Sequence, residues 1–306
     1  MAKRLKKPRS SLLGTFSDLT DIVRHARSGG EIVRGLLPSG MLKPRILNGG
    51  ESPDTDAGGI DQALRRLRNQ LKGDFLDEGA VDYAGIKASP VYRELQETSR
   101  LLPHVHPTEF AQSERLAFWL NLYNVLAIHG IVALEIRKSV MEVPSFFHLV
   151  AYRVSDWVFT LDDIENGVLR RNRPHPAMNN LMFDADDPRM ACCPREVDPR
   201  IHMALVCCAA SCPPVAFYEA KQIDAQLEAA TQNFVESEIL IDDKKRELTL
   251  PLIFRYYEED FGGWQGVGEF MLEHSEGEQH EKIARAIHDG YTARYQRYDW
   301  SLNHVI

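Results

Sequence analysis

The sequence predicts a helix-rich α+β protein, with a small sheet whose buried strand covers about residues 200–208 and with several helices packed against it. Apolar residues recur at helical spacing along much of the chain. The run RIHMALVCC (200–208) is short, apolar and branched, as buried strands are, and residues 239–251 predict a hairpin. Hydrophobic residues make up 44% of the chain and charged residues 26%, as in ordinary globular proteins, so a substantial core can form.

Composition divides the chain into three parts. Residues 1–47 are expected to form a basic tail and short amphipathic helices, the first with apolar residues recurring over 12–23. Residues 48–59 (NGGESPDTDAGG) predict a linker, which leaves 60–306 as the main domain. Residues 1–23 can make a weak contact with a membrane surface, but a solvated tail and a helix docked on the main domain are the favoured interpretation.

Within the main domain, the apolar pattern predicts helices interrupted by one strand and one hairpin. The longest helix, at 115–137, is nearly all apolar and is expected to be buried on most sides. The helix at 161–172 has Asp162 or Asp163 near its positive N-terminal end, where a carboxylate is favourable. The hairpin turns at 242–245. The other expected helices cover residues 60–71, 91–102, 224–237, the stretch up to 272, and 281–295.

Charge and cysteine content narrow the function classes. A net charge of −8 argues against nucleic acid as a partner, because phosphate binding needs a concentrated positive surface. No run of about 18 apolar residues and no secretory signal is evident. The five cysteines, clustered from Cys192 to Cys212, fit reduced thiols in the cytoplasm. No Gly-rich phosphate loop, dinucleotide fingerprint or G-x-S-x-G elbow occurs, so no cofactor is predicted.

Polar residues inside apolar segments are the first candidates for a site. Asn121, Asn124 and His129 lie on one half of the long helix, and a buried amide without partners costs roughly 1–3 kcal/mol. They therefore either line a site or bond to neighbouring backbone. Glu165, on the helix at 161–172, can orient an imidazole, act as a base, or simply be solvated.

The segment 198–214 (DPRIHMALVCCAASCPP) is the richest in reactive groups. On a strand, His202 and Cys208 face one side, and the loop that follows presents Ser211 and Cys212. Pro213-Pro214 stiffens the chain behind the Cys212 thiol, which as a thiolate can act as a nucleophile. The histidines and cysteines include enough soft ligands for zinc, but their spacing matches no recognised ligand pattern, so no metal site is predicted.

Four ordered motifs resemble one family: AFWLNLYNVLAIH (117–129), LDDIENGVLR (161–170), the segment 198–214, and YDWSLN (298–303). They are similar to the domain of unknown function 547, over roughly residues 80–303, a family label that brings no established reaction. The family usually has Asn-Cys-Gly where this chain has 206–208 as Val-Cys-Cys. The resemblance implies these site positions: Asn121, Asn124, His129, Glu165, His202, Cys207, Ser211 and Cys212.

The leading hypothesis is a cysteine-dependent hydrolase or acyl-transfer enzyme acting on a small molecule or peptide. Cys212 is the expected nucleophile, with His202 or His129 as its base. Glu165 or Asn121 is expected to orient that base. The remaining candidates are assigned to binding: Asn124, Ser211, Arg200 and Cys207. The alternatives are a non-catalytic interaction or scaffold module, in which the polar cluster is structural, and a metal-binding domain.

Overall fold

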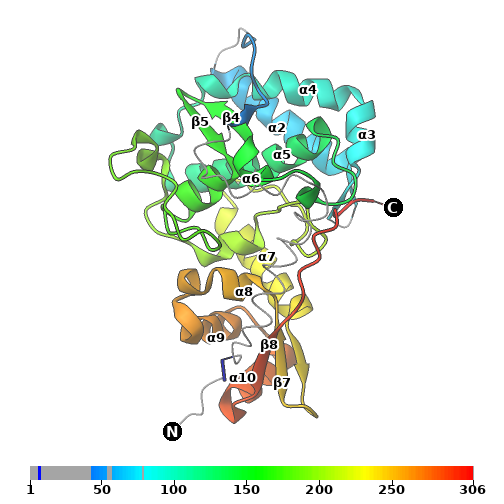
Figure 1. The fold of residues 1–306 in the computed structure, drawn as a ribbon, viewed down its shortest axis with the longest axis vertical. Helices are drawn as coiled ribbons and strands as arrows, with labels where there is room; N and C mark the ends of the chain where they lie inside the picture. The colour runs from blue at the N-terminus through cyan, green and yellow to red at the C-terminus, as the bar shows by residue number, and fades with distance from the viewer. Residues whose placement is uncertain (1–5, 8–42, 54–56, 78, 306) are drawn as a thin grey trace.

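The computed structural model describes residues 6–7, 43–53, 57–77 and 79–305. Figure 1 shows two lobes, one around the long helix α5 and the other around α9 and the strands β7 and β8, with α7 between them. Each lobe has its own hydrophobic core. The helices expected within residues 1–47 lie outside the described residues, apart from positions 6–7 and 43–47.

The α5 lobe is built around a helix that is apolar on nearly every side. α5 (Gln112–Ala133) buries Trp119, Leu120 and Leu126 completely, as its sequence predicts. Among the described residues, α5 is the one helix that is long and apolar enough to cross a membrane. However, 72% of its most apolar 18-residue stretch is buried inside the protein, as in the core helix of a globular domain. The helices around it are α2 (Ala57–Asp74), α3 (Tyr83–Ala88), α4 (Pro90–Ser99) and α6 (Phe146–Leu149).

Short strands complete this lobe. β4 (Val150–Val154) pairs antiparallel with β5 (Trp157–Thr160) and parallel with β1 (Arg45–Ile46), while β2 (Leu76–Asp77) and β3 (Ala80–Val81) form a separate pair. Asn48, within the predicted linker, donates its amide to the carbonyls of Ser99 and Arg153. The chain thus packs against the main domain from residue 45, and the predicted division at 48–59 stays a prediction.

The second lobe contains the hairpin that the sequence predicts at 239–251, which is thereby confirmed. β6 (Leu240–Asp242) pairs with β7 (Glu247–Leu250), and β8 (Thr292–Tyr295) adds to β7 in parallel. The rings of Phe254, Phe261 and Phe270 lie against one another in the core. The helices of this lobe are α8 (Ile253–Tyr256), α9 (Gly263–Glu273) and α10 (Gly277–Asp289), and α7 (Ile223–Glu238) joins it to the α5 lobe.

The buried strand predicted at 200–208 is wrong. Pro199–Met203 is a 3₁₀ helix, whose first turn the Asp198 carboxylate caps by accepting from the Arg200 backbone N–H. Residues 204–207 are irregular, although Ile201, Val206 and the residues between them are buried as expected. Apolarity predicted the burial correctly, but Pro199, which lacks a backbone donor, and the Asp198 cap favour a helical turn over a strand ladder.

The remaining predicted helices are confirmed in place, with two differences in kind. Asp163–Leu169 is a π-helix rather than an α-helix. The helix expected over 281–295 ends at Asp289, because Gly290 adopts a left-handed φ of 67° and turns the chain into β8. The helix-rich α+β class is confirmed.

The C-terminal segment returns from β8 to the α5 lobe (Figure 1). Isolated bridges join Leu302 to Ala209, Ser301 to Ser139, and His304 to Val81. The backbone N–H of Ala210 donates to the Ser301 carbonyl at 2.7 Å. These contacts hold residues 298–300 beside the loop that carries Cys212.

A cysteine and tyrosine pocket

A pocket of about 410 Å³ lies between α5, the π-helix, α8 and the C-terminal segment. This volume suits a small ligand. Its wall combines aromatic rings with ionisable groups. The lining residues are Tyr123, Phe147, Asp162, Glu165, Asn166, His175, Pro176, Ala177, His202, Leu205, Cys207, Cys212, Pro213, Ile253, Arg255, Tyr256, Tyr257, Tyr298 and Trp300.

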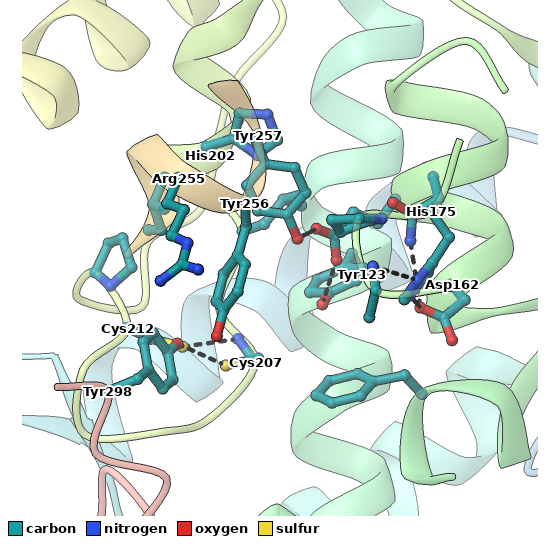
Figure 2. A pocket seen from close by; sticks show the side chains of 18 of the residues that line it. Tyr123, Asp162, His175, His202, Cys207, Cys212, Arg255, Tyr256, Tyr257 and Tyr298 are labelled. Carbon is teal, nitrogen blue, oxygen red and sulfur yellow. Dashed lines mark hydrogen bonds and ion pairs between the residues drawn. The ribbon is translucent and has the colours of Figure 1, made fainter. Parts of the chain in front are cut away.

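Cys207, Cys212 and Tyr298 meet at one end of this pocket (Figure 2). The Tyr298 hydroxyl lies 3.1 Å from Cys212 Sγ and 3.2 Å from Cys207 Sγ. The backbone N–H of Cys207 donates to Cys212 Sγ at 3.2 Å. Cys212 Sγ is therefore surrounded by hydrogen-bond donors.

The two thiols are driven toward opposite protonation states. The hydrogen bond with Cys212, together with burial, raises the pKa of Cys207 well above its ordinary value. Burial opposes ionisation of Cys212 as well, but the hydrogen bonds from Cys207 and Tyr298 outweigh it and lower the pKa of Cys212. Burial and the neighbouring thiols raise the pKa of Tyr298, so its hydroxyl keeps its proton and donates. Cys212 is the sulfur that this arrangement favours as a thiolate.

Glu165 lies in the pocket between two tyrosines. Its two carboxylate oxygens accept from the Tyr123 hydroxyl at 2.9 Å and from the Tyr257 hydroxyl at 2.5 Å. Burial, with the charge of Glu165, raises the pKa of both tyrosines well above the ordinary value. Glu165 comes from the π-helix, a rare geometry that often marks functional sites.

His202 lines the pocket through a buried ionic network. Its Nε2 is 2.9 Å from Asp260 Oδ2, and its ring stacks on Tyr257 at 3.9 Å between centroids. Arg170 makes a two-nitrogen contact with the same carboxylate, at 2.5 and 3.1 Å. Burial tends to raise the pKa of Asp260, but His202 and Arg170 outweigh it and hold that pKa far below its ordinary value.

A second acidic group, Asp162, is held by two histidines at the other end of the pocket. Its oxygens lie 2.5 Å from His148 Nδ1 and 3.5 Å from His175 Nε2. Burial opposes ionisation of Asp162, but these two contacts prevail and lower its pKa. His175 Nδ1 accepts from the backbone N–H groups of Ala177 and Met178, which leaves the proton on Nε2, facing Asp162.

The expected base is not beside the thiol. Within the described residues, no hydrogen bond joins Cys212 to His202 or His129, and Figure 2 shows His202 well separated from Cys212. His129 lies outside the pocket lining: its Nδ1 contacts the Tyr152 hydroxyl at 2.7 Å. Burial lowers the pKa of His129 to about 4, so it is neutral at pH 7.

The two asparagines of α5 lie outside the pocket lining, and their side chains form hydrogen bonds with backbone groups of other segments. Asn124 donates to the carbonyls of Ala204 and Ala216 and accepts from the Val206 N–H at 3.0 Å. Asn121 pairs with the backbone N–H and C=O of Tyr218, both at 2.8 Å. Asn124 thus shapes the irregular segment that leads to Cys207.

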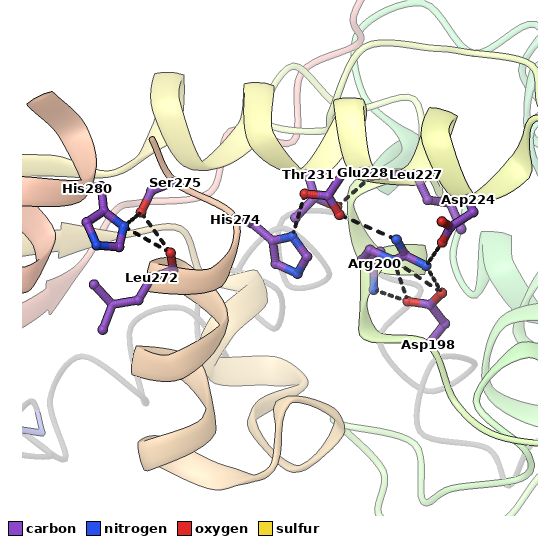
Figure 3. A network of polar contacts seen from close by, with 10 residues as sticks. All are labelled: Asp198, Arg200, Asp224, Leu227, Glu228, Thr231, Leu272, His274, Ser275 and His280. Carbon is purple, nitrogen blue, oxygen red and sulfur yellow. Dashed lines mark hydrogen bonds and ion pairs between the residues drawn. The ribbon is translucent and has the colours of Figure 1, made fainter. Parts of the chain in front are cut away.

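Ser211 and Arg200 also lie outside the pocket lining. The Ser211 hydroxyl accepts from the Asp299 backbone N–H at 2.8 Å, which fastens the C-terminal segment to the cysteine loop. Figure 3 shows Arg200 bound to Asp198, Asp224 and Glu228, and Glu228 in turn bound to His274. Arg200 therefore ties the 3₁₀ helix to α7.

The pocket residues that the sequence-based assignment missed include Tyr257, Arg255, His175 and Tyr298. Tyr298 opens the motif YDWSLN, so that motif was a usable signal. The other three lie outside the four motifs, and nothing local distinguishes them from surface residues. Among the described residues, no group of three or more His, Cys, Asp or Glu side chains is arranged to hold a metal ion.

Comparison with known proteins supports the resemblance that the motifs predict. No curated protein and no solved structure matches the chain. Residues 107–235 match the family model described as a protein of unknown function, DUF547. This stretch contains Glu165, His202 and both pocket cysteines, whereas Arg255 and Tyr298 lie beyond it. Over residues 107–235, the chain is therefore similar to the DUF547 family, as the motifs predict.

Proposed function

We propose that this pocket carries out cysteine-dependent acyl transfer, with Cys212 as the nucleophile and hydrolysis as the case in which water is the acceptor. The observation that carries the proposal is the pair of donors on Cys212 Sγ, the Tyr298 hydroxyl at 3.1 Å and the Cys207 N–H at 3.2 Å. Both favour the thiolate, which is the reactive form of cysteine.

In the first step, the Cys212 thiolate attacks the acyl carbon, and the carbonyl π electrons move to oxygen. Collapse of this adduct expels the leaving group, which takes up a proton, and leaves a thioester on Cys212. Water or another acceptor then attacks the thioester, loses a proton and regenerates the thiolate. The proton that the leaving group takes up equals the one that the acceptor loses. We assign both transfers to solvent water, because His202 lines the same pocket but is well separated from Cys212.

The pH dependence of alkylation tests the nucleophile directly. We expect Cys212 to react with iodoacetamide at neutral pH faster than the other four cysteines, each modified site being read by mass spectrometry. Cys192 is an internal control, because burial raises its pKa to about 11. Cys212→Ala should also abolish turnover of a panel of p-nitrophenyl esters and thioesters. Slow alkylation of Cys212, or unchanged turnover in that variant, would rule out the proposal.

A second candidate function is thiol–disulfide exchange, which the shared Tyr298 hydroxyl and the opposite pKa shifts of the two thiols favour. Cys212 would attack a substrate disulfide and expel one thiolate. Cys207 would then attack the mixed disulfide, leaving a Cys207–Cys212 disulfide and a fully reduced substrate. The variant Cys207→Ser distinguishes the two candidate functions. Acyl transfer should persist in this variant. With a disulfide substrate, the first thiol should still be released, but the second should stay bound to Cys212 as a mixed disulfide.

A further inference from the structure

Arg255 brings a positive charge to the cysteine end of the pocket. In Figure 2 its guanidinium points toward the end that contains Cys212. No other arginine or lysine lines the pocket in the described part of the chain. Within that part, no carboxylate lies in ion-pair distance of Arg255, and its one aromatic contact is with the Tyr295 ring, 5.7 Å away.

The acidic groups of the pocket lie away from Arg255 and are already bound. Asp162 and His175 lie on the opposite side of the pocket from Arg255 (Figure 2), and Asp162 is held by two histidines. Both oxygens of Glu165 accept from tyrosine hydroxyls. The pocket therefore has one cationic end, and that end contains the thiol.

We infer that Arg255 binds a carboxylate of the ligand, which makes the substrates acyl compounds with a carboxylate close to the reacting carbonyl. The guanidinium presents a planar fork of donors that matches the two oxygens of a carboxylate. A single arginine balances the single charge of that group. The substrate class rests on the proposed function, whereas carboxylate binding at Arg255 does not.

Two alkylating reagents of similar size and different charge test the inference. Iodoacetate carries a carboxylate, and iodoacetamide carries a neutral amide in its place. We expect Arg255→Gln to lower the ratio of the iodoacetate rate to the iodoacetamide rate at Cys212 by roughly tenfold, since a hydrogen bond to a charged group is lost. Arg255→Lys should retain part of the ratio. Arg93→Gln, which removes an exposed charge on α4, is the matched control and should leave the ratio unchanged.

A binding measurement separates this inference from the proposed function. If Cys212 reacts slowly with both reagents, acyl transfer fails, and Arg255 is then judged in Cys212→Ala protein by saturation-transfer NMR with benzoate and benzamide. Tighter binding of benzoate than of benzamide, lost when Arg255→Gln is added, supports the site. An unchanged reagent ratio in Arg255→Gln, or equal binding of benzoate with and without Arg255, overturns it.

Discussion

The Tyr298 hydroxyl contacts Cys212 Sγ at 3.1 Å, although 86 residues separate them in the chain. Because this hydroxyl donates to the thiolate, Tyr298→Phe should raise the pKa of Cys212. We expect its alkylation rate at pH 7 to fall by about tenfold, the loss of one hydrogen bond to a charged group. The measurement is the rate of iodoacetamide modification at Cys212 as a function of pH.

Tyr295→Phe is the control for that variant. Tyr295 belongs to the same C-terminal stretch, and its buried hydroxyl has no hydrogen-bond partner in the described part of the chain. Its removal should leave the Cys212 profile unchanged. An equal loss of reactivity in both variants would assign the effect to packing of the segment rather than to the Tyr298 hydroxyl.

Asn124→Ala tests whether the α5 amides are structural. The substitution leaves the Val206 N–H and the carbonyls of Ala204 and Ala216 without their side-chain partner. We expect the free energy of unfolding in urea to fall by about 3 kcal/mol, as for other buried hydrogen-bond networks. A loss near zero would mean that Asn124 does not hold the segment before Cys207.

The pH dependence of stability tests the buried state of His129. Its pKa is lowered to about 4 by burial, below the ordinary value of 6.5. As pH falls below 6.5, the unfolded chain takes up this proton and the folded chain does not, so stability declines. Between pH 7 and pH 5, we expect the native chain to lose about 2 kcal/mol more of its unfolding free energy than His129→Gln does. Identical pH profiles in urea unfolding would contradict this assignment.

Asp260→Asn tests the ionic network behind His202. Asp260 is fully buried, and the Arg170 side chain that it binds is 3% exposed, so the variant leaves a buried cation without its counterion. We expect a loss of about 3–5 kcal/mol in urea unfolding. Glu94→Gln breaks an exposed ion pair of similar length, with Arg66 at 2.6 Å, and should cost far less because solvent screens that pair. Similar costs for the two variants would show that burial does not decide the outcome.

The local sequence pattern predicted the structure correctly where a segment's own residues decide its burial or its turn. The apolar surface of α5 predicted its burial, and the polar turn after Asp242 predicted the hairpin of β6 and β7. It failed at Pro199–Met203, where apolarity indicated burial but could not distinguish a strand from a 3₁₀ helix. The same periodicity put Asn121, Asn124 and His129 on one half of a helix without revealing which neighbours each one contacts.

The sequence by itself determined the helix-rich α+β class, the family motifs and the loop that carries the Cys212 thiol. Only the tertiary structure placed Tyr298 on that thiol, Arg255 at the same end of the pocket, and His129 away from it. The physical reason is range: periodicity and turn chemistry act over a few residues, whereas a thiol's protonation state depends on donors and charges supplied by segments far away in the chain.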